Sequence, residues 1–132
     1  MIFVDSSFWI AEFLPRDRRH EEAMEASRQT AASTLVTSVL VLGETWTFLR
    51  RRAGHTRALA WLDGVLTGDV TRVERIDDAL EDQAWAWLRA HDERPYSFVD
   101  ATSFALMRKL RITEALAFDG DFAAAGFVEL RP

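Results

Sequence analysis

Residues 115–122 read ALAFDGDF, an apolar run that ends at two aspartates. Residues 2–9 read IFVDSSFW and make the same change at Asp5. Short apolar segments bounded by turn residues are typical of strands buried in a parallel sheet. The sequence therefore predicts two buried strands that end on carboxylates, and the chemistry of the protein depends on what those carboxylates face.

Predicted strands and helices alternate along the chain. The strands are predicted at residues 2–4, 33–37, 70–76, 115–118 and 127–130. The helices are predicted at residues 6–14, 17–31, 38–52, 56–66, 77–92 and 97–110, with Ser6 or Ser7 as the cap of the first helix. This alternation predicts an α/β fold with a parallel sheet and right-handed crossovers. The charged segment at residues 70–76 is expected at a sheet edge.

Asp5 and Asp119 each follow the carboxyl end of a predicted strand. In open parallel sheets, ligands bind outside these ends, where the strand order reverses. Both residues also have a purely structural explanation, because Asp5 can cap the following helix and Asp119-Gly120 can form an ordinary turn. Asp100 lies three residues after Ser97, which is the spacing of a capping box. Both interpretations are open at this point.

Glu44 has no comparable local role. Its neighbours one turn before and after it on the predicted helix are largely apolar: Leu40, Val41, Thr47 and Phe48. A carboxylate on an apolar face is costly unless it is paired or metal-bound, and no basic residue stands one turn away. Asp100 shows a related pattern in its own helix. We therefore expect the acidic residues to converge on one pocket: Asp5, Glu44, Asp100 and Asp119.

Convergent carboxylates suit a hard cation, Mg²⁺ or Mn²⁺, rather than zinc. The chain has no cysteine, and its three histidines, His20, His55 and His91, show no ligand spacing. Mg²⁺ takes few carboxylates and keeps several waters, which leaves room for a phosphate oxygen. This is the arrangement of metal-assisted phosphodiester cleavage. No P-loop or GxGxxG motif is present to indicate nucleotide binding.

Length and composition fit one domain over residues 1–132. Apolar residues make up 48% of the chain, and the net charge of −5 argues against an extended basic surface without excluding a local one. No apolar run approaches the roughly 20 residues that span a membrane. We expect a cytoplasmic protein.

Four segments in this order resemble the PIN domain, in its VapC-type toxin branch. They are IFVDSSFWI (2–10), VTSVLVLGETWTFLRR (36–51), SFVDATSFALMRKLRI (97–112) and ALAFDGDFAAAGF (115–127). The resemblance covers nearly the whole chain. It implies a three-layer α/β fold with a central parallel sheet of four to five strands flanked by helices. It also implies a Mg²⁺- or Mn²⁺-dependent endoribonuclease, the toxin of a toxin–antitoxin pair, usually a homodimer and blocked by a cognate antitoxin.

The resemblance assigns roles residue by residue. The catalytic set carried over by motif is Asp5, Glu44, Asp100 and Asp119. Asp5, Asp100 and Asp119 would hold the metal, and Glu44 would position a water or a second ion. Ser6 supplies the hydroxyl that typically follows the first aspartate, and Asp121 is auxiliary. Attack by water would leave a 5′-phosphate and a 3′-hydroxyl.

Arginines and tryptophans extend the prediction. Arg50, Arg51 and Arg52 follow Glu44 down its helix and are candidates for binding substrate phosphates. A second cluster, Arg16, Arg18 and Arg19, is expected near the mouth of the pocket. Solvated helix faces explain both groups equally well. The tryptophans lie at helical spacings among apolar neighbours, which favours core or dimer contacts over base stacking: Trp9, Trp46, Trp61, Trp85 and Trp87.

Two other functions are open. A partner-binding domain could keep the fold without catalysis, although it would have little reason to keep every acidic position. An aspartate-based phosphatase also places an aspartate after its first strand, but it needs a second aspartate close behind and a lysine in the pocket. The only lysine, Lys109, stands outside any such context. Activity on structured RNA rather than on a phosphate ester would distinguish these functions.

Overall fold

A single five-stranded sheet organises the computed structural model, which describes residues 1–132. The strands are β1 (Ile2–Val4), β2 (Leu35–Ser38), β3 (Thr71–Glu74), β4 (Glu114–Leu116) and β5 (Val128–Glu129). Their order is β3-β2-β1-β4-β5, and every neighbouring pair is parallel. The predicted parallel sheet is confirmed, with β3 at an edge.

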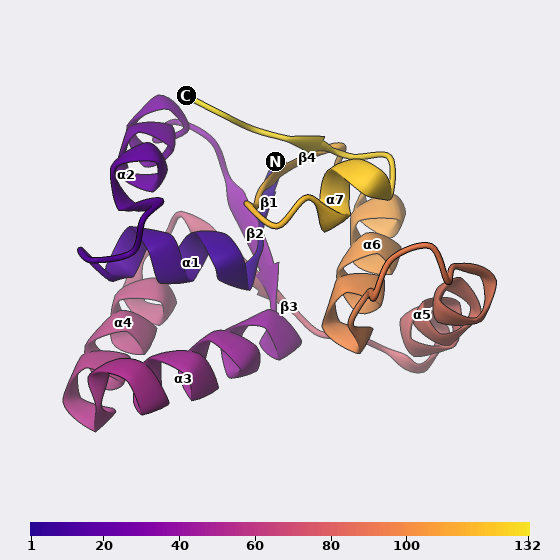
Figure 1. Cartoon of the computed structure of the whole chain (residues 1–132), viewed down its shortest axis with the longest axis horizontal. Helices are drawn as coiled ribbons and strands as arrows, with labels where there is room; N and C mark the ends of the chain where they lie inside the picture. The colour runs from indigo at the N-terminus through magenta and orange to yellow at the C-terminus, as the bar shows by residue number, and fades with distance from the viewer.

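Helices cover both faces of the sheet (Figure 1). They are α1 (Ser6–Phe13), α2 (His20–Gln29), α3 (Val39–Ala53), α4 (His55–Thr67), α5 (Asp78–Ala90), α6 (Phe98–Leu110) and α7 (Asp121–Ala124). Helices α1 to α4 lie on one face, and α5 to α7 lie on the other. Right-handed crossovers explain this division, because the chain moves from β1 to β3 in one direction and then returns across the sheet to β4 and β5. The three-layer α/β architecture is confirmed.

The strand order reverses between β1 and β4. From β1 the chain proceeds to β2 on one side, whereas the strand paired on the other side is β4. At the carboxyl ends of these two strands, the Asp5 amide donates to the Leu116 carbonyl at 3.0 Å. The reversal therefore brings the segment after β1 beside the segment after β4, where the sequence places Asp5 and Asp119.

The core holds these strand ends in place. Phe3 and Val4 are fully buried, and Phe122 packs against Phe3 and Phe104 with ring centroids 5.9 and 5.0 Å away. Residues 101–107 of α6 are all buried, so this helix is fixed along most of its length. Rigid packing on both sides of the sheet leaves the side chains after β1 and β4 little freedom to move apart.

Four of the five tryptophans pack inside the protein as predicted. Trp9 and Trp61 are buried and meet edge to face, while Trp46 and Trp87 are partly buried. Trp85 differs, because 43% of it is exposed and its ring stacks on Phe98 at a centroid distance of 4.4 Å. None of the helices is both long and apolar enough to cross a membrane.

Candidate active site

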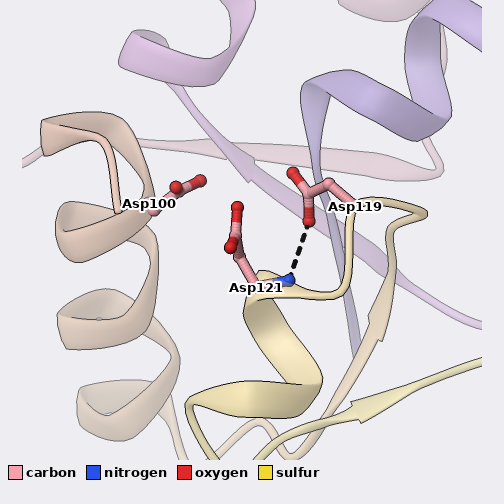
Figure 2. A group of neighbouring side chains, drawn as sticks. All are labelled: Asp100, Asp119 and Asp121. Atoms are coloured by element: carbon pink, nitrogen blue, oxygen red, sulfur yellow. Dashed lines mark hydrogen bonds between the residues drawn. The ribbon is translucent and has the colours of Figure 1, made fainter. Parts of the chain in front are cut away.

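Three carboxylates meet above the carboxyl ends of the central strands. Asp100 comes from the first turn of α6, Asp119 from the segment that joins β4 to α7, and Asp121 is the first residue of α7. One oxygen from each of the three lies within 4.8 Å of the others. Figure 2 shows the three side chains pointing toward one another, with the Asp121 amide donating to Asp119 Oδ1 at 3.1 Å.

Asp5 approaches this cluster from β1 without joining the closest group. Its Oδ2 atom accepts hydrogen bonds from the Ser7 amide at 3.2 Å and from the Ser7 hydroxyl at 2.7 Å, so Asp5 is the N-cap of α1. The predicted cap at Ser6 or Ser7 is wrong, because both residues lie inside the helix. Burial and, to a smaller extent, the neighbouring charge of Asp119 together raise the pKa of Asp5 to about 7.

Asp100 and Asp119 have raised pKa values for the same reason. Burial raises the pKa of Asp100 to about 6, against the opposing hydrogen bond from the Ser97 amide. Burial also raises the pKa of Asp119, and the charge of Asp121 adds to the effect. Buried acids that repel one another bind protons or cations more readily than isolated ones. The cluster therefore has the electrostatics of a cation site.

Capping and site chemistry coexist in these residues. The capping box predicted from Ser97 and Asp100 is present, with Asp100 Oδ2 accepting from the Ser97 amide at 2.9 Å. In Asp5, Asp100 and Asp119, one oxygen accepts hydrogen bonds from nearby backbone, and the other accepts none from the protein. The structural and functional interpretations of these residues are therefore compatible. One oxygen of each carboxylate accepts a backbone hydrogen bond, and the other is free to bind a cation.

Ser7 connects the two strand ends. Its hydroxyl donates to Asp5 and accepts from the Phe118 amide at 3.0 Å, so it links the start of α1 to the segment after β4. From the sequence, Ser7 is expected only as a possible cap. The pairing of β1 with β4 brings the Phe118 amide within hydrogen-bond distance of Ser7, and no local sequence spacing predicts this contact.

Glu44 lies at the rim of the site rather than facing the core. Its side chain is exposed, and its Oε1 atom accepts a hydrogen bond from the Ser6 hydroxyl at 3.1 Å. The predicted apolar surroundings are wrong, because Leu40 is only partly buried and Phe48 is exposed. The buried stripe of α3 lies beside Glu44, along Val41, Leu42, Thr45 and Leu49. The bond to Ser6, next to Asp5, still places Glu44 at the mouth of the cluster.

Arg94 is a residue of the site that sequence reasoning missed. Its Nε atom donates to Asp121 Oδ1 at 2.9 Å, and its terminal nitrogen donates to the Asp119 carbonyl at 3.3 Å. The arginine stands 27 residues before Asp121 in an irregular segment, so no motif or helical spacing points to it. It supplies a positive charge at one side of the acidic cluster.

The other titratable candidates lie elsewhere. The ring of His20 is hydrogen-bonded to the Ala11 carbonyl, His91 pairs with Glu93, and His55 packs against Trp46. Lys109 pairs with Asp77 at 3.5 Å, so the lysine that a phosphatase would need is engaged on the surface. Neither the histidines nor this lysine forms a hydrogen bond or ion pair with Asp5, Asp100, Asp119 or Asp121.

The donor set fits a hard divalent cation. All the atoms that converge are carboxylate oxygens, and Mg²⁺ and Mn²⁺ prefer such ligands. Burial, with the nearby charge of Asp119, raises the pKa of Asp5 and of Asp100, so a bound cation would stabilise both acids. Asp100, Asp119 and Asp121 are near enough to one another to hold one ion, and Asp5 is close enough to feel the charges of Asp119 and Asp100.

Comparisons with known proteins agree with this geometry. The PIN domain family model matches residues 2–128. The 23S rRNA-specific endonucleases VapC20 of two Mycobacterium tuberculosis strains, CDC 1551 / Oshkosh and H37Rv, are each 56% identical over 134 residues, covering 100% of this chain and 99% of theirs. The crystal structure of M. tuberculosis VapC20, described as a sarcin–ricin loop cleaving toxin, superposes with a TM-score of 0.93 at 55% identity over the full length of both chains. The chain therefore belongs to the PIN domain family, in its VapC-type branch.

Proposed function

We propose that this protein is a Mg²⁺- or Mn²⁺-dependent endoribonuclease and the toxin of a toxin–antitoxin pair. The observation that carries the proposal is the meeting of Asp100, Asp119 and Asp121 above the switch point of the sheet, with Asp5 buried beside them. A chain of this family that served only to bind a partner would gain nothing from destabilising carboxylates held so close together.

Large ribosomal RNA is the substrate that we propose. The relatives that match over the whole chain are named as 23S rRNA-specific endonucleases, and the solved one as cleaving the sarcin–ricin loop. With 56% identity and matching length, the surface around the site is expected to suit the same class of RNA. The proposed place of action is the cytoplasm, where ribosomes lie.

The side chains around the site have different proposed roles in hydrolysis. Asp100, Asp119 and Asp121, with Asp5 directly or through water, would hold the ion, which when bound activates water and offsets charge on the phosphate. Ser7 holds one oxygen of the Asp5 carboxylate, and Arg94 pairs with Asp121 and partly balances its charge. Glu44, held by Ser6, is placed at the open side to orient the attacking water. Arg50, Arg51 and Arg52 are exposed at the end of α3, in position to contact RNA phosphates.

Cleavage assays test this function directly. Purified protein is expected to cut ribosomes or a sarcin–ricin loop RNA at one site in Mg²⁺ or Mn²⁺, leaving a 5′-phosphate, and to lose this activity in EDTA. Restoring Mg²⁺ should restore cutting. Undiminished cleavage in EDTA would contradict the metal mechanism, and release of phosphate from a small ester without RNA cleavage would favour a phosphatase.

We also propose a homodimer that a cognate antitoxin inhibits. Exposed apolar side chains on both helical layers, including Leu59 and Leu66 on α4 and Trp85 on α5, support an interface with other chains. An antitoxin segment would cross these helices and direct a basic side chain toward the acidic cluster. Light scattering is expected to give the mass of a dimer at micromolar concentration, rising when the product of the neighbouring gene is added. A monomer whose mass does not change would contradict both proposals.

A further inference from the structure

A hollow of about 460 Å³ lies away from the acidic cluster, between the end of α1 and the bend that joins α3 to α4. The segment after α1 forms one side, and the last turns of α3 with the start of α4 form the other. Its lining is Leu14, Pro15, Arg16, Asp17, Phe48, Arg52, Ala53 and Arg57. None of these side chains belongs to the acidic cluster, although Arg16 and Arg52 are candidate phosphate contacts from the sequence.

The hollow gathers positive charge that the protein does not neutralise. Arg16, Arg52 and Arg57 face it with a single carboxylate, Asp17, whose Oδ1 atom accepts from the Arg19 amide. None of these three arginines forms an ion pair, whereas five others do: Arg19, Arg28, Arg72, Arg94 and Arg131. In a chain of net charge −5, three unpaired guanidinium groups around one hollow make this part of the surface locally positive.

An aromatic ring stands beside these charges. Phe48 is 40% exposed although it is a large apolar residue, and the Arg52 guanidinium lies 5.9 Å from its ring centroid. The Arg57 guanidinium lies 5.5 Å from the ring of Phe13. Sites for single-stranded nucleic acid combine cationic groups for the backbone with exposed rings on which bases stack. The hollow offers both.

The fold places the hollow on a path that leads from the cutting site. Helices α1 and α3 (Figure 1) pack against each other, and Ser6, the first residue of α1, donates to Glu44 in the second turn of α3. Arg52 follows Glu44 by eight residues on α3, which corresponds to about 12 Å along the helix axis. A strand of RNA laid along these helices would reach the hollow a few nucleotides from the bond that is cut.

We propose that this hollow is an RNA subsite, in which Arg16, Arg52 and Arg57 bind backbone phosphate and the ring of Phe48 stacks on a base. The inference rests on the proposed function and adds a second contact that selects RNA extending beyond the cleaved bond. It also assigns RNA binding in this hollow to Arg52 alone among the three arginines at the end of α3, because Arg50 and Arg51 do not line it.

Cleavage kinetics on a sarcin–ricin loop RNA in Mg²⁺ test the subsite. Arg52→Ala and Arg57→Ala are each expected to raise KM severalfold at unchanged kcat, because they remove binding away from the reacting bond. Each should also reduce the slope of log kcat/KM against log salt by about 0.7, the value for one phosphate contact on a single strand. Phe48→Ala should raise KM about fivefold or more without changing the salt slope, since the ring carries no charge.

Arg89→Ala is the matched control, because Arg89 is exposed on α5, on the opposite face of the sheet. It should leave KM and the salt slope unchanged. An equal effect of Arg89→Ala would indicate bulk charge and overturn the inference, as would wild-type kinetics of Arg52→Ala and Arg57→Ala. If those two variants instead lose only antitoxin binding, the hollow serves a protein partner and the RNA assignment is wrong. Wild-type protein that leaves the RNA intact would overturn the proposed function, and this inference with it.

Discussion

Asp5, Asp100 and Asp119 each fix a local turn of backbone while taking part in the acidic cluster. This double use explains how a small domain can hold mutually repelling carboxylates in place. The hydrogen bonds from Ser7, Ser97 and Asp121 anchor one oxygen of each side chain, so repulsion cannot turn the carboxylates out to solvent without breaking a cap or a turn. The geometry for binding a cation is therefore set before the cation arrives.

Arg94 opposes the cluster with a positive charge, and its removal should strengthen cation binding. Its guanidinium bonds to Asp121 and competes with a metal ion for that carboxylate. We predict that Arg94→Ala binds Mg²⁺ about tenfold more tightly than wild type, as measured by calorimetry, because a nearby cation repels the ion. Arg94→Lys keeps the charge and should stay close to wild-type affinity.

Weaker Mg²⁺ binding by Arg94→Ala would reverse this conclusion. It would mean that Arg94 matters chiefly by holding Asp121 in position for the metal, so that loss of orientation outweighs loss of charge. Asp121→Asn serves as the comparison, since it removes the carboxylate itself and should weaken Mg²⁺ binding under either interpretation.

At the scale of elements, the Ser7 hydroxyl joins α1 to the segment after β4. Ser7→Ala would leave the Phe118 amide without its partner and remove both the hydroxyl bond to Asp5 and its support of the cap. We predict a loss of at least about 1 kcal/mol in the free energy of unfolding, the low end of the cost of an unsatisfied polar group, because the Phe118 amide is only partly buried. Urea unfolding of the metal-free protein measures it.

Ser6→Ala is the matched control for Ser7→Ala. Ser6 precedes Ser7 in the same helical turn, but its hydroxyl bonds to Glu44, which is exposed and can be solvated by water instead. Its loss should cost less than about 1 kcal/mol. Equal losses for the two variants would show that Ser7 contributes only as a helix residue and does not connect the strand ends.

The elements that sequence reasoning predicted well are those whose signals are local. The apolar runs before Asp5 and Asp119 give β1 and β4, and the Ser97–Asp100 spacing gives the start of α6. Three acidic residues of the site follow, because strand ends and helix starts in this fold meet at one edge. The exposure of Glu44 and the contact of Arg94 were not predictable, since both depend on how distant segments pack.

For the whole molecule, the raised pKa values make stability depend on pH. Folding raises the pKa of Asp5 from 3.8 to about 7 and that of Asp100 from 3.8 to about 6. At a pH between 3.8 and these raised values, the folded protein therefore binds more protons than the unfolded chain. The stabilising effect of these protons is fully present below the unfolded pKa and is lost as pH rises through about 6 to 7. Metal-free protein should therefore melt at a lower temperature near pH 8 than near pH 5.

Replacing single acids tests whether the repulsion between these carboxylates is that of a metal site. Asp5→Asn and Asp119→Asn each keep an oxygen for the local hydrogen bonds but remove one repelling charge. We predict that both variants lose RNA cleavage, while near pH 8 the metal-free proteins are as stable as wild type or more stable. Added Mg²⁺ should raise the melting temperature of wild type more than that of either variant, by mass action.

The opposite outcome has a defined physical meaning. Asparagine caps helices and fits turns as well as aspartate does, so if capping were the only role of Asp5 and Asp119, both replacements would leave stability and RNA cleavage nearly unchanged. Melting curves with and without Mg²⁺, recorded beside cleavage rates, separate the two cases. Variants that cut RNA at the wild-type rate would exclude the acidic cluster as the catalytic site, because a metal held by these carboxylates cannot tolerate the loss of a buried ligand charge at no cost to the reaction.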